Sequence, residues 1–224
     1  MLIIKKTVLP SSEQWEIIIE GMRNPMNSWD KMDSHGEMIE YDGMWLGLDA
    51  DAFTIGDNDY KLMTQLAKGG PVHAKYRRMI PVWATINAPL YWWKEFDAYK
   101  IGTVTNSCST MHKIHAKEFT MDDFSCEHLY SGKYGNIELL METITCLNVA
   151  RENFIYTKNK NDWWQMIQLL PSSYNQKRTV MLNYEVLCNI YHSRKNHKLD
   201  EWHVFCRWIE NLPYSELITA PGGE

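Results

Sequence analysis

The sequence lacks long apolar runs, paired cysteines and an excess of basic residues. No stretch approaches the roughly 20 apolar residues that span a bilayer, and the short apolar run near the N-terminus has no cleavage-site pattern, so we expect neither membrane insertion nor export. The 5 cysteines are odd in number and form no Cys-x-x-Cys pair, which favours a reducing, cytoplasmic compartment. With 23 basic against 28 acidic residues, a nucleic acid polymer is disfavoured as a partner, although a local site for one phosphate is compatible with this balance.

Motifs of three common enzyme classes are also missing. The sequence has no Gly-x-Ser-x-Gly elbow, no glycine-rich phosphate loop and no Gly-x-Gly-x-x-Gly turn, which leaves hydrolase, P-loop and dinucleotide-binding functions without support. His112 and His115 have a spacing that suits zinc or iron, with Glu127 and His128 downstream, but 8 histidines in 224 residues often fall three apart by chance. We therefore predict no metal site and keep a histidine-based metal hydrolase as a third alternative.

The cysteines differ in the roles that their surroundings predict. Cys108, in the loop TNSCST, is the best placed to act as a nucleophile. Cys146, Cys188 and Cys206 lie on apolar helical stripes, so we expect them in the core.

The chain has 45% apolar residues, enough for the core of a single domain covering residues 1–224. Its first elements are predicted to be a strand over residues 2–9 and a helix that begins at a capping box of Ser11 and Gln14. Residues 24–56 show little periodicity, so we expect them to be irregular.

A helix, a strand and a second helix are predicted next. Asp57 or Asn58 is expected to cap the first helix, which ends at the pair Gly69-Gly70. Apolar residues alternate with polar ones over residues 80–88, as in a strand with one buried face. Pro89 suits the first position of the following helix, for which Gly102 is a plausible stop.

The remainder of the chain is predicted to be mostly helical. The expected helices are one capped by Thr120, one over residues 136–154, a short one from Asn161, a long one carrying Val180 to Tyr191, and a last one carrying Trp202 to Ile209. Strands early and helices late indicate an α+β fold, with a small sheet and long helices.

Two groups of side chains have the composition of a binding site. Trp92 and Trp93 lie about 100° apart on the predicted helix, so we expect at most one to face the core, with Glu95, Tyr99 and Lys100 following at the helix end. The loop TNSCST comes next and offers small donors for a phosphate or a planar ring. Asn183, Asn189 and Arg194 are predicted along one late helix, in which asparagine is unfavourable unless its side chain forms hydrogen bonds.

Taken together, these groups resemble the flavin-dependent thymidylate synthase family. That family has a helix, a Gly-His pair, a strand ending in Ala-Pro, a helix, and then Arg-His-Arg-x-x-Ser-x-Asn-Glu-x-Ser-x-Arg; here KLMTQLAKGGPVH, IPVWATINAP, LYWWKEFD and AYKIGTVTNSCSTM follow in the same order. Leu170-Pro171, RTVMLNYEVLCN, YHSRKNH and Glu201 match the later part. The resemblance covers roughly residues 58–212.

The resemblance implies FAD and a folate one-carbon donor as cofactors, a pyrimidine nucleotide as substrate and a homotetramer as the assembly. It implies C5 methylation of dUMP or a related nucleotide, with a late helix of a neighbouring subunit opposite the TNSCST loop. The roles it implies are catalysis by Tyr99, Lys100 and Arg194; cofactor binding by Asn106, Ser109, Asn183, Asn189 and Arg194; and substrate binding by Glu95, Lys100 and Ser109.

The sequence also departs from the family motif. Arg-His-Arg is replaced by Ala98-Tyr99-Lys100, and Glu185 stands where the family has an arginine, so bidentate phosphate contacts are lost. These losses leave open an alternative, a catalytically inactive homologue that serves as a nucleotide-binding or assembly module. Glu95 replaces a glutamine, and because a carboxylate only accepts hydrogen bonds, it favours an amino-bearing base such as cytosine.

Overall fold

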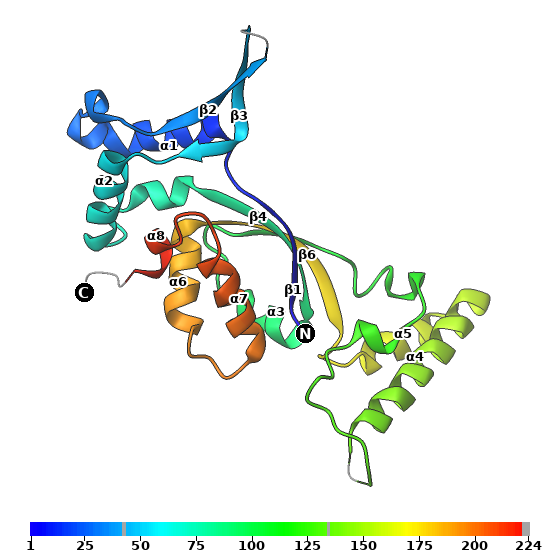
Figure 1. Ribbon diagram of the computed structural model, residues 1–224. Helices are drawn as coiled ribbons and strands as arrows, with labels where there is room; N and C mark the ends of the chain where they lie inside the picture. The colour runs from blue at the N-terminus through cyan, green and yellow to red at the C-terminus, as the bar shows by residue number, and fades with distance from the viewer. Residues whose placement is uncertain (42–43, 134, 221–224) are drawn as a thin grey trace. The chain divides into compact units, whose positions relative to one another are not determined.

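The computed structural model describes residues 1–41, 44–133 and 135–220 (Figure 1). Strands β1 (Ile3–Val8), β4 (Pro81–Pro89), β6 (Asn175–Asn183) and β5 (Val104–Ser107) form a sheet in the order β1-β4-β6-β5. A separate antiparallel hairpin consists of β2 (His35–Tyr41) and β3 (Met44–Thr54). Along β4, buried and half-buried residues alternate, as the sequence predicted.

The helices account for the rest of the regular structure. They are α1 (Ser12–Arg23), α2 (Asp57–Lys68), α3 (Leu90–Phe96), α4 (Ile137–Thr157), α5 (Lys160–Leu169), α6 (Tyr184–Arg194), α7 (Asp200–Glu210) and α8 (Glu216–Thr219). Short 3-10 helices are η1 (Asn24–Met26), η2 (Trp29–Lys31), η3 (Lys75–Met79), η4 (Ile114–Ala116) and η5 (Met121–Asp123). This content confirms the α+β class. Of the helices within the described residues, none is long and apolar enough to cross a membrane.

The described chain divides into two compact units. Unit 1 comprises residues 1–5, 85–98 and 105–179, and unit 2 comprises residues 6–84, 99–104 and 180–224. The prediction of a single domain stays a prediction. In unit 1, α4 lies beside α5 (Figure 1), and Leu140, Ile144 and Leu147 of α4 pack with Met166 of α5 in one apolar cluster. Burial of these side chains stabilises the pair by about 1.5–3 kcal/mol each.

In unit 2, an aromatic cluster joins α1 to the hairpin and to the C-terminal segment. Trp15 of α1 stacks on Phe53 of β3, with ring centroids 5.9 Å apart and planes 10° apart. The ring of Tyr214 meets Trp15 edge-on at 5.9 Å. Its hydroxyl accepts a hydrogen bond from the Ile55 N–H at 2.9 Å.

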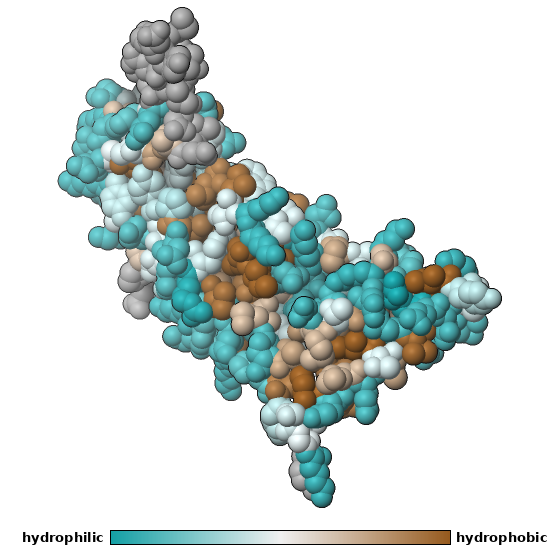
Figure 2. All heavy atoms as spheres, turned by 45° about the vertical axis from the view of Figure 1, so that its right-hand side comes forward, coloured by the Kyte–Doolittle hydropathy of each residue, from teal (hydrophilic) through white to brown (hydrophobic). Residues whose placement is uncertain are grey.

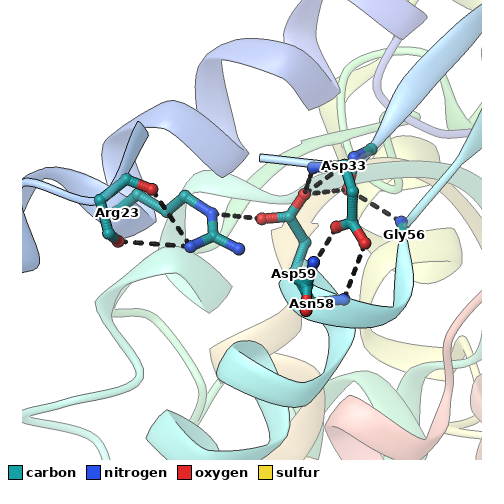
Figure 3. A network of polar contacts seen from close by, with 7 residues as sticks. Arg23, Asp33, Gly56, Asn58 and Asp59 are labelled. Carbon is teal, nitrogen blue, oxygen red and sulfur yellow. Dashed lines mark hydrogen bonds and ion pairs between the residues drawn. The ribbon is translucent and has the colours of Figure 1, made fainter. Parts of the chain in front are cut away.

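A buried ionic network fixes the start of α2 in unit 2 (Figure 3). Asp59 is fully buried; one of its carboxylate oxygens accepts from Arg23 Nε at 2.5 Å. The other accepts from the Ser34 hydroxyl at 2.6 Å and from the N–H groups of Asp33 and Ser34. In return, the Asp33 carboxylate accepts from the N–H groups of Asn58 and Asp59, which have no partners within the first turn of the helix. The Asp33 carboxylate therefore caps α2, while the Asp59 carboxylate in turn binds the backbone of residues 33 and 34.

The electrostatics of this network favour the ionised form of Asp59. Burial alone would raise the pKa of Asp59, but hydrogen bonds from the Ser34 hydroxyl, the Asp33 N–H and Arg23 together hold the pKa below its usual value. Arg23 is also buried, so each charge depends on the other for compensation.

Several local predictions are confirmed. Strand β1 and the Ser11–Gln14 capping box at the start of α1 are present. Helix α2 ends at Gly69, although Gly56 rather than Asp57 or Asn58 is its N-cap. Likewise, Pro89 is the N-cap of α3 and not its first helical residue, and α3 ends at Phe96, well before Gly102.

Other local predictions are wrong. Residues 24–56, expected to be irregular, contain the β2–β3 hairpin, whose register is broken by bulges. The helix expected after Thr120 is only the single turn η5, although Thr120 and Asp123 do form a capping box. The long helix expected from Val180 begins only at Tyr184, because Val180 belongs to strand β6.

Burial corrects two more expectations. Trp92 and Trp93 are both buried, since the two-turn helix α3 is covered on more than one side. Cys146 is exposed, whereas Cys188 and Cys206 are buried as predicted.

Candidate functional site

In unit 1, strand β6 holds both the end of α3 and the loop that follows β5. Trp93 Nε1 donates to the Gln176 carbonyl at 2.9 Å, and the Arg178 guanidinium lies 4.3 Å from the Trp93 ring centroid. Arg178 also donates to the Asp97 carboxylate at 2.7 Å. A stacked and ion-paired arginine loses little further entropy, so this contact orients the end of α3.

The segment TNSCST, predicted to be a loop, begins within β5, and only its last three residues follow the strand. It is attached to β6. The Cys108 N–H donates to the Lys177 carbonyl, and Gln176 Nε2 donates to the Cys108 carbonyl, both at 2.9 Å. Ser109 Oγ accepts from the N–H groups of Met111 and Lys113, so its hydroxyl helps to shape the turn. Asn106 and Ser109 are exposed, and Glu95 on α3 is half-buried. These three predicted site residues all lie in unit 1.

In unit 2, Arg194 is held at the end of α6 by two aromatic rings. Its Nε donates to the Tyr99 hydroxyl at 2.8 Å. The guanidinium carbon lies 5.0 Å from the centroid of Trp202 and 5.6 Å from that of Tyr99. Trp202 is fully buried on α7, and a cation in the last turn of a helix also interacts favourably with the helix dipole. The result is a half-buried, oriented cation.

The other end of α6 is shaped by Asn183 and Gly102. Asn183 is the N-cap, and its Oδ1 accepts from the Val186 N–H at 3.0 Å. The backbone of Gly102, at a φ of +78°, passes so close that a Cβ there would lie 3.1 Å from Asn183 Nδ2 and 3.0 Å from a Val186 methyl. Residues 99–104 therefore follow α6, with Gly102 at its start and Tyr99 at its end.

Glu185 is explained by a buried partner in the same unit. Its carboxylate lies 3.9 Å from Arg77 of η3, and both side chains are buried. Arg77 also donates to the sulfur of Cys188 at 3.6 Å, while burial raises the pKa of that thiol. Glu185 thus compensates the charge of a buried arginine, and Cys188 is not activated as a nucleophile.

The predicted residues of unit 2 are brought together only in part. Tyr99, Asn183 and Arg194 are linked through α6 and residues 99–104, while Lys100 and Asn189 are exposed. Tyr99 and Arg194 meet within one chain; a contribution from a neighbouring subunit stays a prediction. Across residues 1–41, 44–133 and 135–220, no three His, Cys, Asp or Glu side chains are grouped as metal ligands.

The polar residues that position these segments carry no motif in the sequence. Gln176, Arg178 and Arg77 were not singled out, because each is one polar residue without a motif. The period-two spacing of Gln176, Arg178 and Val180 is the signal that would have placed the first two on a strand.

Solved structures with the same fold are found at low sequence identity. Thymidylate Synthase X (ThyX) from Helicobacter pylori, crystallised with FAD and dUMP, has a TM-score of 0.61 at 15% identity over 98% of this chain and 96% of that chain. The chain has the flavin-dependent thymidylate synthase fold. A UMP/dUMP methylase, PolB from Streptomyces cacaoi, bound with 5-Br UMP, shares this fold with a TM-score of 0.58 at 13% identity over 100% of this chain and 96% of that chain.

Sequence comparison adds no closer relative to this fold. No protein-family model matches the sequence, and no curated protein matches it. The resemblance to flavin-dependent thymidylate synthases that the sequence predicted is confirmed at the level of the fold.

Proposed function

We propose that this protein is a pyrimidine nucleotide-modifying enzyme that transfers a one-carbon unit to C5 of dUMP or a related nucleotide. The observation that supports this proposal most directly is the orientation of Arg194 by Tyr99 and Trp202 at the end of α6. Structural neighbours with the fold were crystallised with dUMP or with 5-Br UMP, which supports a pyrimidine nucleotide as the ligand.

The phosphate of the nucleotide is assigned to Arg194 and Lys100. The guanidinium of Arg194, which Tyr99 holds through Nε, would bind the phosphate oxygens. Lys100 is exposed one residue after Tyr99 and would add a second positive charge. Tyr99 would donate its hydroxyl proton to the ligand, because its oxygen already accepts from Arg194.

FAD is the cofactor that the neighbours suggest, and it would supply the redox chemistry of the one-carbon transfer. By the family resemblance, the carboxamides of Asn106, Asn183 and Asn189 would hold it; Asn106 in unit 1 and Asn189 in unit 2 are exposed, and Asn183 is half-buried. The fit to a pyrophosphate is poorer, because Ala98-Tyr99-Lys100 provides one cation and the Ser109 hydroxyl is used by the loop backbone. A folate would be the one-carbon donor.

Calorimetric titration with dUMP, dCMP and UMP tests the nucleotide site. Arg194→Gln should weaken binding by about 10- to 100-fold, as expected for a charge-assisted hydrogen bond of about 1.5–3 kcal/mol. Lys195→Gln is the matched control, since it removes the neighbouring positive charge without touching Tyr99 or Trp202. Circular dichroism verifies that both variants are folded. Equal binding by Arg194→Gln and the wild type would refute the assignment.

Catalysis is tested separately from binding. The purified protein is heated, and the released ligands are analysed for flavin by absorbance and mass spectrometry. Turnover is followed as a mass gain of the nucleotide in the presence of reduced flavin and methylenetetrahydrofolate. Nucleotide binding without flavin or turnover would favour the alternative, a non-catalytic nucleotide-binding or assembly module, for which the loss of Arg-His-Arg is the argument. Preference for dCMP over dUMP is expected if Glu95 contacts the base.

A further inference from the structure

A cavity lies in unit 2 beside the aromatic cluster of Trp15, Phe53 and Tyr214. Its volume is about 280 Å³, and residues 7–10 form another part of its lining. Apolar side chains are common on the surface of this protein, as the brown areas in Figure 2 show, so exposure alone does not identify a binding site. A cavity lined by aromatic rings is more informative, because it selects ligands by shape.

The backbone at Tyr214 is strained, and the strain sets the position of its ring. Its φ is +52°, in the left-handed region that is unfavourable for a bulky side chain. Hydrogen bonds hold this conformation: the Tyr184 hydroxyl donates to the Pro213 carbonyl at 2.5 Å, and the Tyr214 hydroxyl donates to the Phe53 carbonyl at 3.3 Å. Lys6, which precedes residues 7–10, also has a positive φ of +54°. Strained residues of this kind cluster at ligand-binding sites.

The chemistry of the lining indicates an uncharged ligand. The Tyr214 hydroxyl is used by the Ile55 N–H and the Phe53 carbonyl, so its ring contributes apolar surface. Thr7 Oγ1 accepts from Trp208 Nε1 at 3.0 Å, which leaves the hydroxyl hydrogen of Thr7 to donate to a ligand. No charged side chain is found among the described residues that line the cavity, so an ion would lose its hydration without gaining a partner there.

The volume indicates the size of the ligand. An apolar cavity of roughly 150 Å³ holds one benzene ring, so about 280 Å³ suits two fused rings. A flat ligand of this size can pack on the half-buried rings of Phe53 and Tyr214 in the offset or edge-on geometry that aromatic pairs prefer. Trp15 already makes both kinds of contact, since it stacks on Phe53 and meets Tyr214 edge-on.

We propose that this cavity binds an uncharged, planar compound of two fused aromatic rings that directs one acceptor atom at the Thr7 hydroxyl. The proposal does not rest on the proposed nucleotide site, because none of the residues assigned to that site lines the cavity.

Quinoline is a suitable probe, because it has two fused rings, one acceptor nitrogen and no charge at neutral pH. Saturation-transfer NMR should show saturable binding with a Kd of about 1 mM or below, which is ordinary for a ligand of this size. N-methylquinolinium has the same ring system with a permanent charge and no acceptor, so it should bind at least tenfold more weakly. The proposal is wrong if quinoline shows no saturable binding up to about 10 mM, or if both compounds bind equally.

Substitutions in the lining locate the site. Tyr214→Gly removes the ring and tolerates the positive φ, and it should weaken quinoline binding at least tenfold, whereas Tyr214→Phe keeps the ring and should bind within about threefold of the wild type. Val8→Trp, at a position that is 55% exposed, fills the cavity from the other wall and should also weaken binding. Tyr130→Gly, at an exposed tyrosine of unit 1, is the matched control and should have no effect.

The hydrogen bond to Thr7 is tested with a second ligand. Thr7→Val should weaken quinoline binding by about two- to tenfold and leave the binding of naphthalene, which has no acceptor, unchanged. Equal effects on both ligands would refute the role of the Thr7 hydroxyl. Wild-type affinity for quinoline in both Tyr214→Gly and Val8→Trp would overturn the proposal as a whole. Circular dichroism of each variant verifies its folding.

Discussion

Replacement of Asp59 by asparagine tests the network that joins α1, the hairpin and α2. The carboxylate uses one oxygen for Arg23 and the other for three donors from Ser34 and Asp33. An amide has only one oxygen, so its NH2 group must face a donor in either orientation. Arg23 would be left buried without a compensating charge. Breaking such a pair costs about 3–5 kcal/mol, a large part of the 5–15 kcal/mol that stabilises a typical domain.

Urea unfolding measures this loss directly. The midpoint for Asp59→Asn should fall with an unchanged slope, whereas Asp57→Asn, at an exposed first-turn position of the same helix, should cost no more than about 1 kcal/mol. A loss below about 1 kcal/mol for Asp59→Asn would refute the argument that the two buried charges depend on each other.

The difference in stability between the wild type and Asp59→Asn should also depend on pH. Because the pKa of Asp59 is lower in the folded than in the unfolded protein, the stability contributed by its charge is complete above the unfolded value of about 3.9. It is lost as the pH falls through the folded value. The difference in stability between wild type and Asp59→Asn should therefore be constant near neutral pH and shrink in acid. An unchanged difference down to the acid transition would contradict the lowered pKa.

Two further substitutions test close packing. Gly56→Ala should destabilise the protein by about 1–3 kcal/mol in urea unfolding, because its Cβ would lie 2.3 Å from Cγ of Asp33; a neutral effect would show that the Asp33 cap can shift without cost. Trp93→Phe should cost about 1–3 kcal/mol, because it removes the donor to the buried Gln176 carbonyl. Trp164→Phe, at a partly exposed position of α5, should have little effect, and equal losses for the two tryptophans would argue against the hydrogen bond.

Local signals in the sequence predicted the elements whose stabilisation is local. The Ser11–Gln14 box and the alternation along β4 require only near neighbours and one buried face, so both are confirmed. Strand β6 was missed because Val180, Tyr184, Leu187 and Tyr191 also fit helical spacing, and the phase of the strand continues into α6 without a break. The β2–β3 hairpin was missed because bulges interrupt its alternation.

The candidate site was accessible mainly through the family resemblance. Tyr99 and Arg194 are 95 positions apart, so no periodicity connects them. The proximity of Gly102 to Asn183 likewise depends on how residues 99–104 follow α6. Glu185 was noticed as a departure from the family, but its partner Arg77 becomes evident only once both side chains are seen to be buried.

The interleaving of the two units along the chain has a practical consequence. Strands β4 and β6 each begin in one unit and end in the other, and the chain crosses between the units again on either side of residues 99–104. No single terminal deletion can therefore yield either half as an autonomous fragment. A protease that cuts at a boundary between the units would yield nicked protein and not two separable fragments. The roles of the two units would therefore have to be studied with point substitutions instead of truncations.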